Sequence, residues 1–344
     1  MLHKSDPLTK SRKCRASLPP HHDKERWRRP YIDNRDWSIY NERLVERGEF
    51  YLSIDFIDQW DDQLSQMNAG KRGRPFLYPE GFIEWMARIR ALLQMPYRQM
   101  EGFVRKLAEF IPHLKAADYT TLFRRIKSMD LSLFVMPEIL AEDIIVAADS
   151  TGIKVTNRGE WMREKWRVQR GWIKVHAMVD TETNLVLGLE ITDESVQDDQ
   201  MFIPILDQTQ LHCGEEHSVN RALADGAYDR NALFNILEHR GIASGIKTRA
   251  DAATHSTGSP YRAECVRNRN QLGGYQAWSK VVAYGMRWKA EGCFSAFKRI
   301  FGEGVRATSR EGMFREIRMK MNCYNMLIAL AAGLKVNSRR ETAT

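Results

Sequence analysis

The sequence predicts an α/β fold, a sheet covered by helices, preceded by an all-α domain. A chain of 344 residues has the length of about two domains. Apolar residues recur at helical spacing as far as residue 127, whereas short apolar runs typical of strands begin at residue 144. The 43% hydrophobic and 28% charged residues are ordinary for a globular protein and exclude a collagen-like or wholly disordered chain.

The first domain is expected over residues 31–135 and consists of helices. Its elements, in order, are a helix at 44–67, a linker at 70–75 rich in glycine and arginine, and shorter helices at 80–93, 97–110 and 118–127. Asp118 and Thr120 are candidates to cap the last helix. A series of short helices of which the last is basic is typical of a helix-turn-helix fold. The last helix of such a fold enters the major groove of DNA. Its basic residues, Arg124, Arg125 and Lys127, are therefore candidate DNA contacts, although a helical dimerisation unit has the same pattern.

The second domain is expected over residues 140–334. Its apolar runs predict strands at 144–148, 173–179, 185–191, 221–224 and 241–247, with a hairpin turn at 180–184. Its helical segments are 201–208, 231–239, 282–301 and 312–333. Residues 249–280 are polar and without a clear period, so we interpret them as an excursion before the last two helices. Strands followed by crossing helices favour a sheet covered by helices.

Positive charge is concentrated at the two ends of the chain. The formal net charge is +8, and residues 1–30 hold nine Lys or Arg against three Asp or Glu. Residues 335–344 hold three against one. We interpret both segments as flexible and basic, a composition suited to nucleic acid because Lys and Arg displace its counterions. A solvated terminus without function is the equally weighted alternative.

Cysteine usage and hydropathy favour the cytoplasm. The five cysteines form no Cys-x-x-Cys pair, so neither a disulfide framework nor a zinc site is indicated. The longest apolar stretch, Met326–Leu334, has nine residues, about half of the ~20 that a spanning helix needs. No apolar signal core follows the basic residues of the amino terminus. We expect a cytoplasmic protein with no membrane partner.

Two predicted strands end in aspartate, at Asp149 and Asp225. Functional side chains collect where strands of an α/β sheet end, so the two carboxylates are candidates for one site. Each is also a common turn residue. A third acid, Glu291 in the predicted helix 282–301, supports the hypothesis that these carboxylates form one site.

That helix carries a polar row beside an apolar face. At 100° per residue, one arc holds Tyr284, Arg287, Glu291 and Lys298. The apolar face holds Met286, Ala290, Cys293, Phe297 and Phe301. A solvated surface explains the charged row, but an acid flanked by arginine and lysine is also what a site that handles phosphates around a metal requires.

The spacing Tyr284-x2-Arg287-x3-Glu291-x6-Lys298 resembles the signature of DDE transposases of bacterial and archaeal insertion sequences, in the group usually labelled four and five. Further segments resemble the family in the same order: Tyr97–Phe103, Asp118–Arg125, Asp149–Gly152, Trp172–His176 with Asp180, and Ala224–Tyr228. The resemblance covers about residues 73–333.

The resemblance implies a ribonuclease-H-like mixed sheet in which Asp149, Asp225 and Glu291 are the catalytic, metal-binding acids. They would hold two Mg²⁺ ions, which Mn²⁺ can replace, with Asp149 bridging them. Carboxylate oxygens suit these ions, and such a pair supplies the nucleophile and shields the leaving oxygen. Arg287 and Lys298 would contact phosphates of DNA ends, and Tyr284 would donate to a phosphate or support a base.

The function that the resemblance implies is DNA transposition. The enzyme would bind inverted terminal repeats of double-stranded DNA as a homodimer on paired ends, cleave the DNA and join it to a target, in the prokaryotic cytoplasm at the nucleoid. One alternative is a catalytically silent, transposase-derived DNA-binding protein. Another is a nuclease with the same metal site and no joining activity.

Tryptophans lie among basic residues at 154–174, where Trp161, Trp166 and Trp172 are interleaved with seven Lys or Arg. Aromatic rings among cations can stack displaced bases. Trp172 is expected in the core instead, because it adjoins a strand. Trp288, beside the polar row, is a further candidate for stacking.

Overall fold

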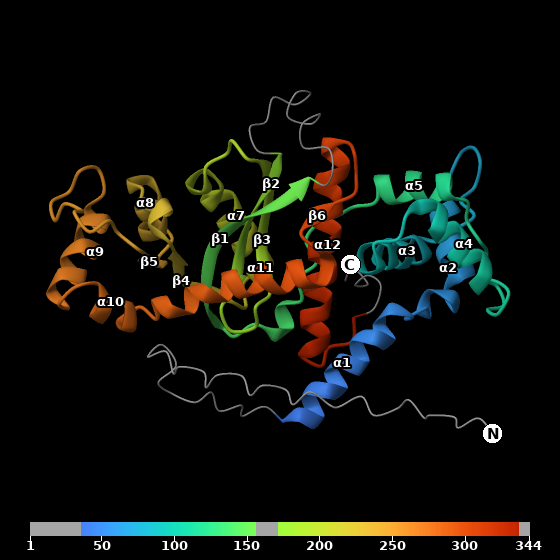
Figure 1. Cartoon of the computed structure of the whole chain (residues 1–344), viewed down its shortest axis with the longest axis horizontal. Coiled ribbons are helices and arrows are strands. Elements are labelled where there is room, and N and C mark those ends of the chain that lie inside the picture. Colours follow the sequence, from blue (N-terminus) through green and yellow to red (C-terminus); the bar gives the residue numbers. More distant parts are fainter. Residues whose placement is uncertain (1–35, 156–170, 337–344) are drawn as a thin grey trace, which may run out of the picture. The chain divides into compact units, whose positions relative to one another are not determined.

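The computed structural model describes residues 36–155 and 171–336 (Figure 1). The basic arm expected at 1–30, most of the tail expected at 335–344, and Trp161 and Trp166 lie outside the described residues. Among the described residues, those up to Glu42 belong to one unit and those from Arg43 onward to another. Helix α1 (Trp37–Tyr51) begins in the first unit and ends in the second, which holds all other described elements.

The N-terminal part of the larger unit is helical, as predicted. After α1 come the 3-10 turn η2 (Asp55–Ile57), helices α2 (Trp60–Asn68), α3 (Glu80–Leu93), α4 (Tyr97–Leu107) and α5 (Tyr119–Ser128), and the 3-10 turn η3 (Pro137–Ile139). The bounds of α3 confirm the helix predicted at 80–93. Asp118, rather than Thr120, caps α5, because its carboxylate accepts the backbone amides of Thr120 and Thr121, each at 3.0 Å.

The single helix expected at 44–67 is wrong, because the chain leaves the helix after Tyr51 and re-enters one at Trp60. In the break, the Ser53 hydroxyl donates to the Asp55 carboxylate at 2.9 Å. Short polar side chains of this kind compete with a helix for hydrogen bonds. Phe56 of η2 is 1% exposed, so packing of its ring stabilises the break.

Within the described residues, six strands form one mixed sheet in the order β3-β2-β1-β4-β5, with β6 paired to β1. The strands are β1 (Asp143–Val155), β2 (Trp172–Asp180), β3 (Val186–Asp193), β4 (Ser218–Ala224), β5 (Ala243–Ile246) and β6 (Gly304–Val305). β1, β2 and β3 pair antiparallel, whereas β4 is parallel to both β1 and β5. This is the ribonuclease-H-like arrangement that was predicted.

Helices cover both faces of the sheet (Figure 1). On one face, α7 (Asp198–Cys213) and α8 (Asn231–His239) share a hydrophobic core with the strands. The close approach of α7 requires Gly188, since a Cβ at that position would lie 2.1 Å from the carbonyl oxygen of Ile205. The other face is covered by α11 (Trp288–Phe301) and α12 (Arg310–Ala331).

Helix α12 joins the sheet to the N-terminal helices. The buried Asn325 side chain accepts the amide of Val186 at 3.0 Å and donates to the carbonyls of Val186 and Phe134 at 2.8 and 2.7 Å. Residues of α3, α11 and α12 belong to one hydrophobic core. The helical part and the α/β part of this unit are therefore packed against each other.

Helices α9 (Pro260–Gln271) and α10 (Tyr275–Val281) and the 3-10 turn η5 (Tyr284–Arg287) lie between β5 and α11. The sequence shows no helical period over α9 because an arginine stands on its buried face: Arg269 is 8% exposed, beside the buried Ala263 and Val266. None of the helices in the described ranges combines the length and apolar character that crossing a bilayer demands.

A buried ion pair on α12 generates a prediction about stability. Glu316 and Lys320 lie 2.9 Å apart, with side chains 5% and 4% exposed. Glu316→Gln should lower the free energy of unfolding by about 3–5 kcal/mol, because Lys320 would remain buried without its counter-charge. Urea denaturation measures the change. Glu311→Gln on the same helix is the matched control: Glu311 is 65% exposed and lies 3.8 Å from Lys127, so its loss should change stability by less than about 1 kcal/mol.

The effect of Glu316 should also depend on pH. Burial opposes ionisation, but Lys320 and the Ala307 amide outweigh it and hold the pKa of Glu316 below its ordinary value, which is about 4.3. The stabilisation is therefore complete above that ordinary value and is lost as the pH falls through the lower folded-state pKa. The free energies of unfolding of the wild type and of Glu316→Gln should therefore converge as the pH falls. A difference between the two that stays constant down to about pH 3 would contradict this account.

Candidate active site

Asp149 lies inside β1 and not at a strand end, so that part of the prediction is wrong. β1 continues to Val155 because its second half pairs with β2 and β6. The parallel partner β4 stops earlier, and the pair Ala147–Leu223 is the last one between β1 and β4. Asp149 therefore stands just past the point where β4 leaves the sheet.

Asp225 follows β4 directly, two residues beyond Leu223, as Asp149 is two residues beyond Ala147. Side chains alternate between the faces of a strand, and Ala147 and Leu223 both belong to the core on the α11 face. The register thus carries both carboxylates toward α11. Asp225 also caps the 3-10 turn η4 (Gly226–Tyr228) by accepting the amide of Ala227 at 2.8 Å.

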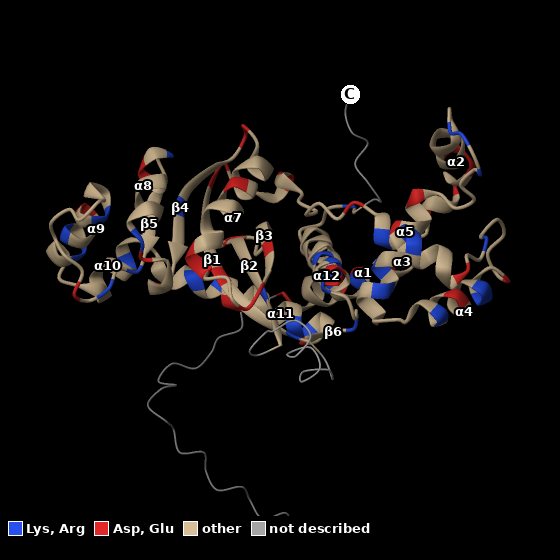
Figure 2. Cartoon of the chain, turned by 90° about the horizontal axis from the view of Figure 1, so that it is seen from above, with Lys and Arg blue, Asp and Glu red and all other residues tan. Residues whose placement is uncertain are grey.

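Glu291 reaches the same place from the first turn of α11. The continuous helix expected at 282–301 is wrong at its start, because Tyr284–Arg287 is a 3-10 turn and α11 begins at Trp288. The Arg287 guanidinium pairs with Glu291, and its other terminal nitrogen lies 3.7 Å from Oδ2 of Asp149. Figure 2 shows acidic and basic residues meeting beside β1. The predicted apolar face of the helix is buried, except that Met286 is only partly so.

The electrostatics of Asp149 reflect both other acids. Burial is the main cause that raises the pKa of the Asp149 carboxyl above its ordinary value, and the negative charges of Asp225 and Glu291 raise it further. The Ser150 amide and Arg287 act in the opposite direction. The geometry of the site rests on two contacts and one register: Arg287 lies beside both Asp149 and Glu291, and the pairing of β1 with β4 carries Asp149 and Asp225 toward the same face.

Tyr284 and Lys298 lie farther from the acids. Tyr284 is 8% exposed, with its ring centroid 5.2 Å from that of Trp278, and burial is the main cause that raises its pKa to about 12. Its ring lies under Arg287, 5.9 Å from the guanidinium carbon. Lys298 is half-buried two turns along α11, where its charge acts on Glu303. Tyr284 is thus placed to support Arg287.

A second group of polar residues lies next to Asp149 in the fold, and the sequence reasoning largely missed it. Asp198, in the first turn of α7, lies 2.8 Å from the Lys174 ammonium and 3.3 Å from Nδ1 of the fully buried His176. Burial raises the pKa of Asp198, but its close polar contacts with His176, Lys174 and Ser150 outweigh burial and leave the pKa below its ordinary value. Ser150 is the neighbour of Asp149, so this group ties the start of α7 to β1. The segment Trp172–His176, which contains Lys174 and His176, was singled out in the sequence, but nothing there connected it to Asp198.

The chemistry of the site fits a hard divalent cation. Within residues 36–155 and 171–336, no group of three or more histidine, cysteine and acidic side chains is close enough to hold a metal ion as it stands. The positive charge near Asp149 and Glu291 is that of Arg287. Yet all three acids offer the oxygen ligands that Mg²⁺ prefers. The Tyr228 hydroxyl is buried without a hydrogen-bond partner among the described residues. Its pKa is raised by burial and by acids that include Asp149 and Asp225, so it can donate to a carboxylate or a water of this site.

The candidate DNA contacts on α5 are placed differently from one another. Arg125 is held inside the helical part, since it lies 2.6 Å from the Glu80 carboxylate and donates to the Tyr78 carbonyl. Arg124 is exposed, and Lys127 is exposed and 3.8 Å from Glu311 of α12. Arg124 and Lys127 are therefore the residues of α5 that can reach a partner.

Trp172 and Trp288 are both exposed. Trp172 is 37% exposed and not in the core as expected, because its ring lies over Gly152 on the neighbouring strand and 5.8 Å from the Lys154 ammonium. Trp288 is 58% exposed at the start of α11, directly after Arg287. Both rings can stack on a planar group without a change in the fold.

Two family profiles, both described as Transposase DDE domain, match residues 45–158 and residues 140–326. The second match covers more than half of the chain, so the protein belongs to the DDE transposase domain family.

Among solved structures, the chain is similar at low identity to proteins that move DNA. A piggyBac transposase in a synaptic complex with hairpin DNA shares 10% identity, with 86% of this chain and 77% of that chain covered and a TM-score of 0.38. The Drosophila P element transposase in a strand transfer complex shares 10%, with 80% and 71% covered and a TM-score of 0.30. A simian T-cell lymphotropic virus intasome in complex with PP2A regulatory subunit B56 gamma shares 12%, with 75% and 77% covered and a TM-score of 0.25. These likenesses are distant, and family membership rests on the profile match.

The supporting role of Asp198 can be measured without an activity assay. Asp198→Ala should lower the free energy of unfolding by about 1.5–3 kcal/mol, because Lys174 and His176 lose a charged hydrogen-bond partner. Asp207→Ala on the same helix removes an acid that is 56% exposed and paired with Arg240, and should change stability by less than about 1 kcal/mol. Equal effects of the two substitutions in chemical denaturation would show that Asp198 is an ordinary surface acid.

Proposed function

We propose that this protein is a transposase that binds the inverted terminal repeats of an insertion sequence and catalyses metal-dependent cleavage and strand transfer of double-stranded DNA. The observation that supports the proposal is the contact of Arg287 with both Asp149 and Glu291, in a chain of the DDE transposase family in which the strand register carries Asp225 toward the same face as Asp149. Carboxylates repel phosphate, so a protein that only binds DNA has no use for three of them beside a basic row.

The three acids would hold two Mg²⁺ or Mn²⁺ ions. When bound, such ions supply a strong nucleophile and shield the charge on the leaving oxygen. Backbone amides orient two of the ligands in advance: Ser150 donates to Asp149 at 2.9 Å and Ala227 donates to Asp225 at 2.8 Å. The side chain of Glu291 is 55% exposed, so Glu291 is the acid that can change partner most easily.

Arg287 and Lys298 would contact phosphates of the DNA end. A guanidinium binds phosphate with the same two-pronged geometry as carboxylate, so a DNA phosphate can replace Glu291 as its partner. Tyr284 would hold Arg287 from below, and Trp288 would offer its exposed ring to a base at the DNA end.

The remaining parts of the chain would recognise the DNA. Arg124 and Lys127 of α5 are the proposed contacts of the helical part, with Arg125 positioning the helix. Two element ends must be held together for joining, so we expect a homodimer on paired ends. The reaction would take place on nucleoid DNA in a prokaryotic cytoplasm.

Asp149→Asn is the first test of the catalytic proposal. The variant should fold normally and lose end-specific cleavage by roughly three orders of magnitude or more, the scale of removing one essential group from a catalytic unit. Labelled duplexes with the element ends, incubated with Mg²⁺ or Mn²⁺, report the cuts. Asp143→Asn, at the exposed start of the same strand, is the matched control and should cut like the wild type.

The outcomes separate the proposal from its alternatives. Cleavage that survives Asp149→Asn would refute the proposed role of this acid. Specific binding of the ends without any cleavage by the wild type would favour a silent DNA-binding protein. If the wild type cleaves DNA but does not join pre-cleaved ends to a target, the result would favour a nuclease without joining activity.

Metal binding can be measured independently of cleavage. Arg287 competes with a cation for Asp149 and Glu291, so Arg287→Met should raise the affinity for Mn²⁺ by roughly three- to tenfold, the amount expected from a partly exposed ion pair of about 1 kcal/mol. Titration of free Mn²⁺ by electron paramagnetic resonance gives the affinity. Lys289→Met removes the same charge two residues away and should have little effect. An affinity that is unchanged or lower in Arg287→Met would contradict the arrangement.

A further inference from the structure

The segment that follows β5, residues 247–249, lies directly beside Asp225. Ala224 pairs with Ile246 across β4 and β5, and the Lys247 amide donates to the Ala224 carbonyl at 3.1 Å. Lys247 therefore follows β5 where Asp225 follows β4. A Cβ added to Gly226 would lie 3.6 Å from the Lys247 carbonyl oxygen, so the two segments are in close contact.

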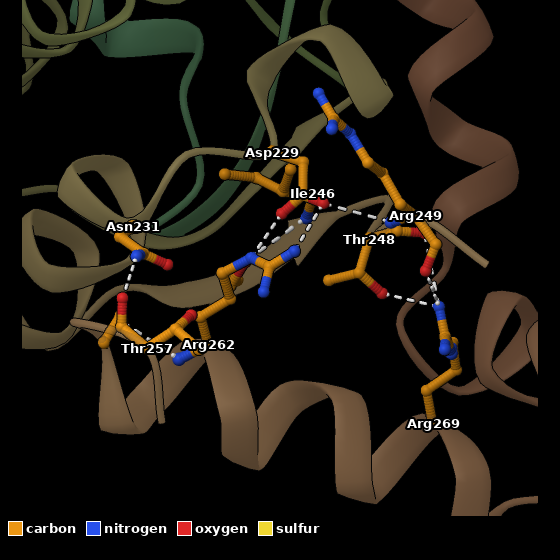
Figure 3. Close-up of polar contacts among 10 residues, drawn as sticks. Asp229, Asn231, Ile246, Thr248, Arg249, Thr257, Arg262 and Arg269 are labelled. Carbon is orange, nitrogen blue, oxygen red and sulfur yellow. Dashed lines mark hydrogen bonds and ion pairs between the residues drawn. The ribbon is translucent and has the colours of Figure 1, made fainter. Parts of the chain in front are cut away.

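Helix α9 holds this segment from the inside with an arginine (Figure 3). The buried Arg269 guanidinium donates to the Thr248 hydroxyl at 2.7 Å, the Thr248 carbonyl at 3.2 Å and the Arg249 carbonyl at 2.9 Å. The backbone carbonyls of the segment are thus fixed by a charge in the interior.

Asp229 holds the same segment by its amide. The Asp229 side chain is fully buried, accepts the Arg249 amide at 3.0 Å and receives two hydrogen bonds from Arg262, at 2.6 and 2.8 Å. Burial opposes ionisation, but Arg262 and the Arg249 amide outweigh it and keep the pKa of Asp229 below its ordinary value. We call Asp229, Arg262 and Arg269 the α9 clamp.

The clamp is more than a short surface turn requires. Water can satisfy the backbone of an exposed loop, whereas charged side chains lose hydration when they are buried and are stabilising only with good partners. What the clamp adds is a fixed direction for the side chains of Lys247 and Arg249, which are both exposed. In Figure 3 the Arg249 guanidinium extends away from the hydrogen bonds of the clamp.

Aromatic rings connect Lys247 to the polar row of α11. The Lys247 ammonium lies 4.9 Å from the Tyr275 ring, which contacts the Tyr284 ring at 5.8 Å. Tyr284 in turn lies under Arg287. Cations therefore stand at both ends of a row of packed rings.

From this geometry we infer that Lys247 and Arg249, held by the α9 clamp, form a second phosphate-binding site for the DNA backbone, next to Asp225. The inference rests on the proposed function. Arg249 offers a planar fork and Lys247 a compact charge, the two forms in which proteins bind phosphate. The DNA backbone that binds there can belong to the element end or to the target DNA, because both carry the same phosphate groups.

The test compares two double variants of the full-length chain with equal loss of charge. The first is Lys247→Gln with Arg249→Gln. The control is Arg267→Gln with Lys280→Gln, two exposed residues of α9 and α10 outside the clamp. Binding to an element-end duplex and to a target duplex is measured by fluorescence anisotropy at several salt concentrations. Each lost phosphate contact should reduce the slope of log affinity against log salt by about 0.9.

The first variant should lower the slope by about 1 to 2 on at least one of the two duplexes, and the control should leave both slopes unchanged. A change on the element-end duplex identifies the element end as the ligand, and a change on the target duplex identifies the target. Equal slopes for the wild type and the first variant on both duplexes, or equal losses in both variants, would overturn the inference. Because binding is read directly, a wild type that binds but fails to cleave contradicts the proposed function and still leaves this test readable.

Arg269→Lys tests the clamp itself. It preserves the charge and removes the planar guanidinium whose Nη1 donates to the Thr248 and Arg249 carbonyls, so affinity should fall although the net charge is unchanged. Circular dichroism checks that the variant folds. Full affinity in a folded Arg269→Lys would show that the clamp does not position the site, while the double variant tests the site in either case.

Discussion

The candidate site depends on one guanidinium that neutralises acids from two parts of the fold. Arg287 pairs with Glu291 on a helix and lies 3.7 Å from Asp149 on a strand. Without a positive charge, acids at this range repel one another and favour protonation. The contact is possible only because α11 packs its apolar face on the sheet, with Ala290 and Phe297 fully buried. The hydrophobic core thus sets the distance at which the charges meet.

The acids differ in how firmly they are held. Asp149 and Asp225 each accept a nearby backbone amide, and Asp198 ties the strand of Asp149 to the start of α7. Glu291 stands on an exposed first turn. The same division appears in the α9 clamp, where buried charges hold the backbone and leave Lys247 and Arg249 at the surface. A fixed frame with a few adjustable charges suits the binding of a polyanion.

The sequence predicted the fold class better than the local geometry of its elements. Helical spacing identified α3 and α12, and apolar runs identified β1 to β5, because both patterns follow directly from burial. The break between α1 and α2 was missed because Ser53 and Asp55 act through local hydrogen bonds that no period records. Helix α9 was missed because a buried arginine stands where an apolar residue was expected. The pairing of Arg287 with Glu291 is a local contact between residues four apart, which the spacing allows, whereas the approach of Arg287 to Asp149 is a tertiary contact that no spacing records.

The most direct measurement is the anomalous diffraction of crystals soaked with Mn²⁺. The account predicts manganese peaks bounded by carboxylate oxygens of Asp149, Asp225 and Glu291, with the Arg287 guanidinium displaced from Glu291. Peaks confined to other acids, or a pair of Arg287 and Glu291 that persists in saturating Mn²⁺ with no peak between the three carboxylates, would contradict it.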